Sequence, residues 1–115
     1  MRVALITTLL AGITGCASPQ LVTREIEEPP RMVEVILAHI PVGTPIDDAQ
    51  HFMEHEGFKC SRQTNAQIPG HEWDYLYCDR HESLGWWVSR RWQVHVGYRD
   101  GKVTEVEAHT GLIGP

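Results

Sequence analysis

The sequence lacks the local signatures that carry most enzyme chemistry. None of its serines lies in a G-x-S-x-G elbow, and no glycine-rich loop of the kind that cradles phosphate is present. Basic residues are also few: 10 Lys and Arg stand against 15 Asp and Glu, a balance that argues against nucleic acid as a partner. We therefore predict a protein that is not an enzyme, that needs no cofactor and that does not bind nucleic acid.

No apolar run is as long as the roughly 20 residues that a membrane-spanning helix needs. The N-terminal run, residues 3–13, follows Met1 and Arg2. One positive charge before a short apolar run is the pattern of a secretory signal segment. The run ends in Ile13-Thr14-Gly15-Cys16, which resembles the lipobox of bacterial lipoproteins. In that family the cysteine is acylated and the chain is cut just before it.

The lipobox resemblance implies where in the cell envelope the protein is located. Residues 1–15 are then a signal peptide, and Cys16 carries acyl chains such as palmitate, which hold a protein stably when there are two or more. Ala17 stands where an Asp favours retention at the inner membrane, so the resemblance implies the outer membrane, with the domain facing the periplasm. The alternative is a soluble secreted protein in which Cys16 is incidental.

Cysteine is scarce, with three in the chain. If Cys16 is the anchor, Cys60 and Cys78 remain, and an exported chain meets an oxidising compartment. We predict a disulfide between them, closing a loop of about 19 residues and worth roughly 3 kcal/mol. A pair of buried reduced thiols is the alternative. A redox role is disfavoured because the chain has no C-x-x-C spacing.

The rest of the chain divides into a tether and one small domain. Residues 16–30 are polar and rich in proline, which predicts a lipid-anchored tether, and residues 31–115 are long enough for a single domain.

Residues 31–40 fit either a short helix, favoured by the preceding prolines, or a buried strand, favoured by β-branched residues. Residues 45–56 predict an amphipathic helix, with an N-cap at Thr44. Its expected apolar face comprises Ile46, Ala49, Phe52 and Met53.

The second half of the domain has the period of two that is typical of strands. We expect strands over residues 58–61, 73–78, 86–98 and 102–109. The predicted fold is an α+β two-layer sandwich, in which one or two helices pack on an antiparallel meander of three to four strands.

The turn between the last two strands can be placed from the apolar pattern. A two-residue loop at Asp100-Gly101 puts Val96 opposite Glu105. A three-residue loop with a glycine bulge avoids that mismatch, so we predict the longer loop. Its expected pairs are Val96 with Thr104, Val94 with Val106 and Trp92 with Ala108.

Several motifs together resemble the SmpA/OmlA group of small outer-membrane lipoproteins. They are the lipobox, the acidic tether, the helix start VGTPIDDA, the GF that follows the helix, Trp73-Asp74-Tyr75 and the final DGKVTEVE. The resemblance within the domain spans about residues 42–108. The resemblance implies a lipid-anchored accessory protein of outer-membrane biogenesis that binds other envelope proteins. The cysteine pair is not part of that group's pattern.

Two sets of side chains are candidates for a binding surface. Trp73, Tyr75 and Tyr77 share one face of a predicted strand, while Leu76 and Cys78 share the other. Exposed aromatic side chains often mark a protein interface or a sugar-stacking surface. Ordinary cross-strand packing is the alternative.

The second set is Asp47, His51 and His55, which share one face of the predicted helix. Two imidazoles and a carboxylate can chelate a transition metal, although Phe52 stands where an H-E-x-x-H motif has its glutamate. A solvated polar face is the alternative. These two sets support a second function hypothesis, a periplasmic ligand-binding module for cell-wall glycan or metal.

Overall fold

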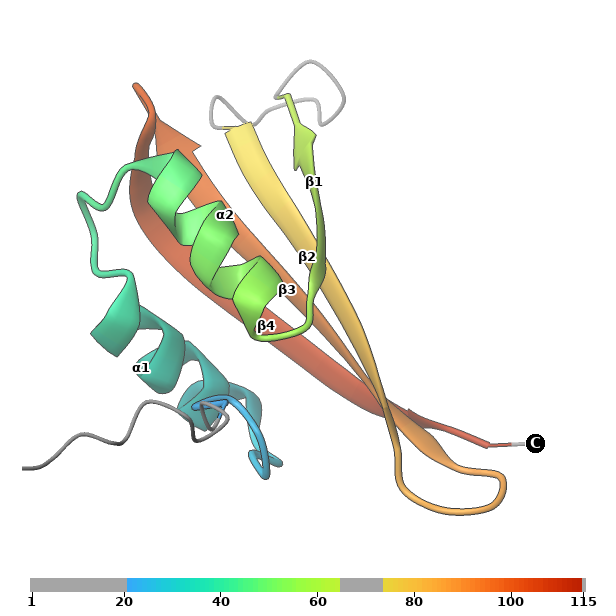
Figure 1. Ribbon diagram of the computed structural model, residues 1–115. Coiled ribbons are helices and arrows are strands. Elements are labelled where there is room, and N and C mark those ends of the chain that lie inside the picture. Colours follow the sequence, from blue (N-terminus) through green and yellow to red (C-terminus); the bar gives the residue numbers. More distant parts are fainter. Residues whose placement is uncertain (1–20, 65–73, 115) are drawn as a thin grey trace, which may run out of the picture.

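Figure 1 shows the computed structural model, which describes residues 21–64 and 74–114. Two helices cover one face of a four-stranded antiparallel sheet with the strand order β1-β2-β3-β4. α1 packs against β4, and α2 packs against β1 and β4. The predicted α+β two-layer sandwich is confirmed. The elements are α1 (Pro29–His39), α2 (Ile46–His55), β1 (Lys59–Gln63), β2 (Asp74–Ser83), β3 (Ser89–Arg99) and β4 (Lys102–Ile113).

The ambiguous segment 31–40 is helical, so the strand alternative is wrong. α1 begins at Pro29, because proline fits the first positions of a helix, where its missing N–H costs nothing. Met32, Val35 and Ile36 have the spacing of one helix face, and all three are buried.

The predicted amphipathic helix is present, but its capping differs. α2 begins at Ile46, and no side chain caps it. Thr44 is not the N-cap, because its hydroxyl donates to the carbonyl of Pro41 at 2.6 Å. The N–H of Ile46 instead donates to the carbonyl of Gly101 at 2.8 Å, so the start of the helix is held by the β3–β4 turn. The predicted apolar face is otherwise correct, with Ile46, Ala49 and Met53 buried and Phe52 partly buried.

The domain begins earlier than predicted. Within the segment expected to be a tether, residues 21–28 lie against the domain, with Thr23 and Ile26 buried. The expected boundary at residue 30 is therefore too late. Residues 16–20 of the predicted tether, with Cys16, and the predicted signal peptide lie outside the described residues. Neither helix is long and apolar enough to cross a membrane.

Side chains alternate across the sheet as the period of two requires. On β2, Leu76 and Cys78 face the helices and are fully buried. The same face of β3 contributes Trp92, Val94 and Val96 to the core. The opposite face has no helix over it in Figure 1. The strand register gives this face mainly polar side chains, such as Asp79, Gln93 and His95.

The predicted three-residue loop between β3 and β4 is wrong. Arg99 pairs with Lys102, so the loop has two residues, Asp100 and Gly101, whose φ angles of 55° and 77° are both left-handed. This is the geometry of a type I′ turn, whose twist matches that of a hairpin.

Apolar pairing is restored by a bulge further along the same hairpin. Tyr98 pairs with Val103 and Gly97 with Glu105, so Thr104 is an extra residue in β4. Beyond this bulge the observed pairs are Val96 with Val106, Val94 with Ala108 and Trp92 with Thr110.

Candidate functional site

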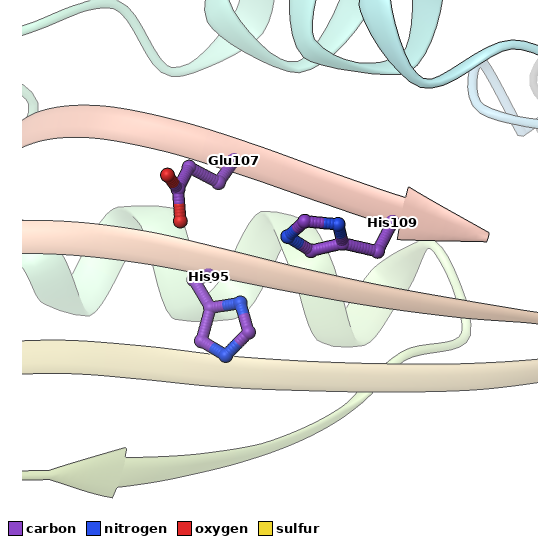
Figure 2. Close-up of side chains that lie close together, drawn as sticks. All are labelled: His95, Glu107 and His109. Atoms are coloured by element: carbon purple, nitrogen blue, oxygen red, sulfur yellow. The ribbon is translucent and has the colours of Figure 1, made fainter.

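The open face of the sheet brings together a group of polar side chains. His95 comes from β3, and Glu107 lies directly opposite it on β4. His109 is two residues further along β4, so it shares a face with Glu107. Figure 2 shows the Glu107 carboxylate and the His109 ring reaching from β4 towards His95, on the side of the sheet away from α2.

The ligand atoms of these three side chains, one nitrogen from each histidine and one carboxylate oxygen, all lie within 4.8 Å of one another. The two imidazole rings have their centroids 6.2 Å apart and are nearly perpendicular. Glu107 and His109 are exposed and free to adjust, whereas His95 is half-buried. In chemical terms, this is a set of two nitrogens and one oxygen that suits a transition metal.

His95 is the most constrained member of the group. Its ring packs between Tyr75 and Tyr77, with centroid distances of 5.9 and 5.2 Å. Burial lowers the pKa of His95, so the imidazole is neutral near pH 7 and has a lone pair to offer. Its Nδ1 is buried and has no hydrogen-bond partner within the described residues.

The predicted aromatic surface is therefore not an exposed stripe. Tyr75 is only 6% exposed, and the hydroxyl of half-buried Tyr77 accepts a hydrogen bond from Gln93 at 2.8 Å. Both tyrosines pack against the ring of His95, across the strand pair. Trp73 lies outside the described residues.

The predicted helix-face metal set is not assembled. Arg62 of β1 forms an ion pair with Asp47, and this partner holds the pKa of the carboxyl below its usual range. The Nδ1 of His55 lies 3.8 Å from a Glu56 carboxylate oxygen instead. In the part of the chain that the structure describes, Asp47, His51 and His55 form no compact group of ligand atoms. The sequence pattern could not reveal this, because Arg62 comes from a different element.

A second feature of the surface is the connection between β2 and β3. Trp86 and Trp87 were expected to open a strand, but β3 begins at Ser89 and both indoles lie in the loop. Their exposed fractions are 91% and 64%, and their rings lie 6.3 Å apart. Register places Ile113 at the end of β4 opposite Ser89. We call the exposed apolar group at this end of the sheet the aromatic tip; it comprises Leu84, Trp86, Trp87, Val88, Leu112 and Ile113.

The N-terminal segment of the domain contacts β2 just before the aromatic tip begins. Arg24 Nη1 is 3.6 Å from a Glu82 carboxylate oxygen, and Glu82 precedes the tip by two residues. In Figure 1 the tip extends beyond the helices, at the end of the sheet where the C-terminus lies.

The two cysteines of the domain lie directly opposite each other on β1 and β2. Their sulfur atoms are 3.1 Å apart, a contact between two thiols rather than a bond. The contact with Cys60, together with burial, raises the pKa of the Cys78 thiol far above its usual range. The disulfide stays a prediction, and the opposed pairing of the two strands is compatible with it.

No family model, curated protein or solved structure matches this chain. The resemblances to the lipobox and to the SmpA/OmlA group therefore stay predictions from the sequence motifs.

Proposed function

We propose that this chain is a lipid-anchored, non-enzymatic cell-envelope protein that acts as an accessory module, binding another envelope protein through its aromatic tip. The observation that carries the proposal is the exposure of Trp86 and Trp87 at the end of a hairpin. Exposed apolar patches mark interaction sites, and tryptophan is enriched where binding energy concentrates.

The position of the tip supports a partner near the membrane. Residues 21–28 pack on the domain, so only residues 17–20 separate the proposed anchor, Cys16, from Leu21. The five Cα–Cα steps from Cys16 to Leu21, at about 3.5 Å each, reach at most about 18 Å. The contact between Arg24 and Glu82 supports an aromatic tip at the same end of the domain as the proposed anchor. The expected partner is a protein of the outer membrane's periplasmic side with an apolar groove, and the sequence resemblance suggests outer-membrane biogenesis as its setting.

Site-specific photo-crosslinking of the anchored full-length chain tests this proposal. A photoreactive amino acid replaces Trp87 in one variant and Val42 in the control. The control is matched, because Val42 is 66% exposed and apolar but lies in the α1–α2 connection, away from the tip. Mass spectrometry then identifies what each position captures in living cells.

We expect position 87 to capture one discrete envelope protein that position 42 does not. Replacing the neighbouring Trp86 by serine should reduce that capture, because the two indoles form one surface. Capture of lipid alone at position 87 would assign the tip to the bilayer surface and contradict a protein partner. Equal capture at both positions would also contradict the proposal.

A further inference from the structure

The geometry of the open sheet face points to a binding site for a divalent transition metal, zinc or copper, formed by His95, Glu107 and His109. This inference is independent of the proposed docking of the aromatic tip. It also differs from the metal site predicted on α2, whose residues the structure does not bring together.

Strand geometry explains why these three residues meet. Residues two apart on a strand point to the same face, which brings Glu107 and His109 together. The hairpin register places His95 directly opposite Glu107 and diagonal to His109. Diagonal neighbours lie about 7–8 Å apart, within reach of long side chains. The site therefore rests on two hydrogen-bonded strands rather than on a loop, and such strands hold ligands more precisely.

The distances between the three ligand atoms are close to those of a metal site. With zinc–nitrogen bonds of about 2.0–2.1 Å, the ligand atoms of a tetrahedral site lie about 3.3 Å apart. The three ligand atoms here lie within 4.8 Å of one another. The remaining difference is small enough to be removed by rotation of Glu107 and His109, both of which are exposed.

His95 shows that the group is more than a solvated polar surface. Its Nδ1 is buried and has no hydrogen-bond partner within the described residues. A buried polar atom without a partner costs about 1–3 kcal/mol, so such atoms call for an explanation. An ion held by this nitrogen would satisfy it. Tyr75 and Tyr77 fix the orientation of the ring from its other sides.

The site offers three protein ligands and faces solvent, because Glu107 and His109 are exposed. A fourth position is then open to water or to a further ligand. Zinc and copper(II) both accept imidazole and carboxylate, and copper binds more tightly to a given set of such ligands.

Calorimetric titration of the full-length chain with ZnCl2, in detergent and without a histidine tag, tests the site. Cys60→Ser is titrated in parallel, because an unchanged affinity in this variant shows that the ion is not held by the Cys60–Cys78 pair. His109→Gln removes one ligand from an exposed position and should leave the fold intact. His95→Gln removes the buried ligand, with thermal unfolding measured as a check on folding. The matched control replaces the two helix histidines, His51 and His55, by glutamine.

We expect one zinc ion per chain with a dissociation constant below about 10 µM. Loss of outer-shell partners of a metal typically costs 10- to 100-fold in affinity, so loss of a direct ligand in His109→Gln should cost at least tenfold. The control variant should bind as the unaltered chain does. The site is refuted if binding is weaker than about 10 µM, if His109→Gln binds equally well, or if the control variant loses the ion.

Discussion

At the scale of single residues, the stability of the molecule depends on whether Cys60 and Cys78 are two thiols or a disulfide. Their backbones are held opposite each other by the strand pairing, and their sulfur atoms lie 3.1 Å apart. Cys78 is fully buried and its pKa is raised, so its thiolate is disfavoured. Half-buried Cys60 is therefore the sulfur that an outside oxidant reaches first.

We expect protein isolated from an oxidising compartment to contain the Cys60–Cys78 disulfide. In that state, addition of a reductant should lower the free energy of unfolding by about 3 kcal/mol, as expected for a closed loop of about 19 residues. Urea unfolding with and without dithiothreitol measures this difference. In Cys60→Ser the reductant should have no effect. Recovery of both cysteines as free thiols, by alkylation without reduction, would contradict the prediction.

At the scale of elements, the β3–β4 hairpin depends on a turn that two adjacent left-handed residues make possible. Gly101 has a φ of 77°, which costs a residue with a side chain about 1–2 kcal/mol. We therefore expect Gly101→Ala to lower the free energy of unfolding by about 1–2 kcal/mol. In a urea titration this appears as a lower midpoint with an unchanged slope m. Asp100→Asn should leave stability equal or slightly higher, since Asn-Gly is favoured in this turn type.

Gly111 of β4 provides the matched control for this substitution. An added Cβ at Gly111 meets nothing within 4 Å, and its φ is not left-handed. Gly111→Ala should therefore leave stability unchanged or raise it slightly, because it restricts the unfolded chain. If Gly101→Ala is as stable as Gly111→Ala, the turn is not of the type described.

The same hairpin shows how far the sequence predicts this molecule. Apolar periodicity correctly predicted the buried face of α2, and it correctly placed Leu76 and Cys78 on the same face of a strand, since both depend only on spacing along one element. The pairs that it predicted between β3 and β4 are wrong, because Val96 pairs with Val106 and not with Thr104, and Val94 pairs with Ala108 and not with Val106. The bulge at Thr104 was missed, although it does break the period of two: Val103 and Val106 are both buried, and they are three residues apart instead of two or four.

The missed bulge also explains why the candidate metal site was not predicted. In the predicted register His95 lies opposite Glu105 and Arg91 lies opposite His109, which separates the two histidines. In the observed register His95 lies opposite Glu107, and His109 is its diagonal neighbour. The spacing of Glu107 and His109 on one strand is visible in the sequence, but the third ligand depends on the register.

At the scale of the whole molecule, Arg80 joins segments that are distant along the chain. It is only 4% exposed, and its guanidinium lies 4.4 Å from the centre of the Phe58 ring. Its Nη1 donates to the hydroxyl of Thr23 at 2.7 Å and to the carbonyl of Glu56 at 2.8 Å. The Glu56 carboxylate in turn accepts from the N–H and the hydroxyl of Thr23, while Glu82 pairs with Arg80 from the same strand.

This buried network fixes the N-terminal segment at Thr23 against β2 and the end of α2, and it therefore limits how far the proposed anchor can lie from the aromatic tip. Removal of one partner of a buried ion pair leaves the other charge buried without compensation, which costs about 3–5 kcal/mol. We therefore expect Arg80→Met to lower the free energy of unfolding by that amount. We also expect trypsin to cut after Arg24 before the rest of the domain unfolds.

Arg62→Met is the control, because Arg62 also pairs with a carboxylate, that of Asp47, but both side chains are largely exposed. Exposed pairs contribute about 0–1 kcal/mol, so this variant should unfold near the midpoint of the unaltered protein and keep its resistance to trypsin at Arg24. Equal losses in the two variants would mean that the Arg80 network does not hold the N-terminal segment. The aromatic tip would then have no limited distance from the proposed anchor, and a partner at the membrane surface would have no geometric support.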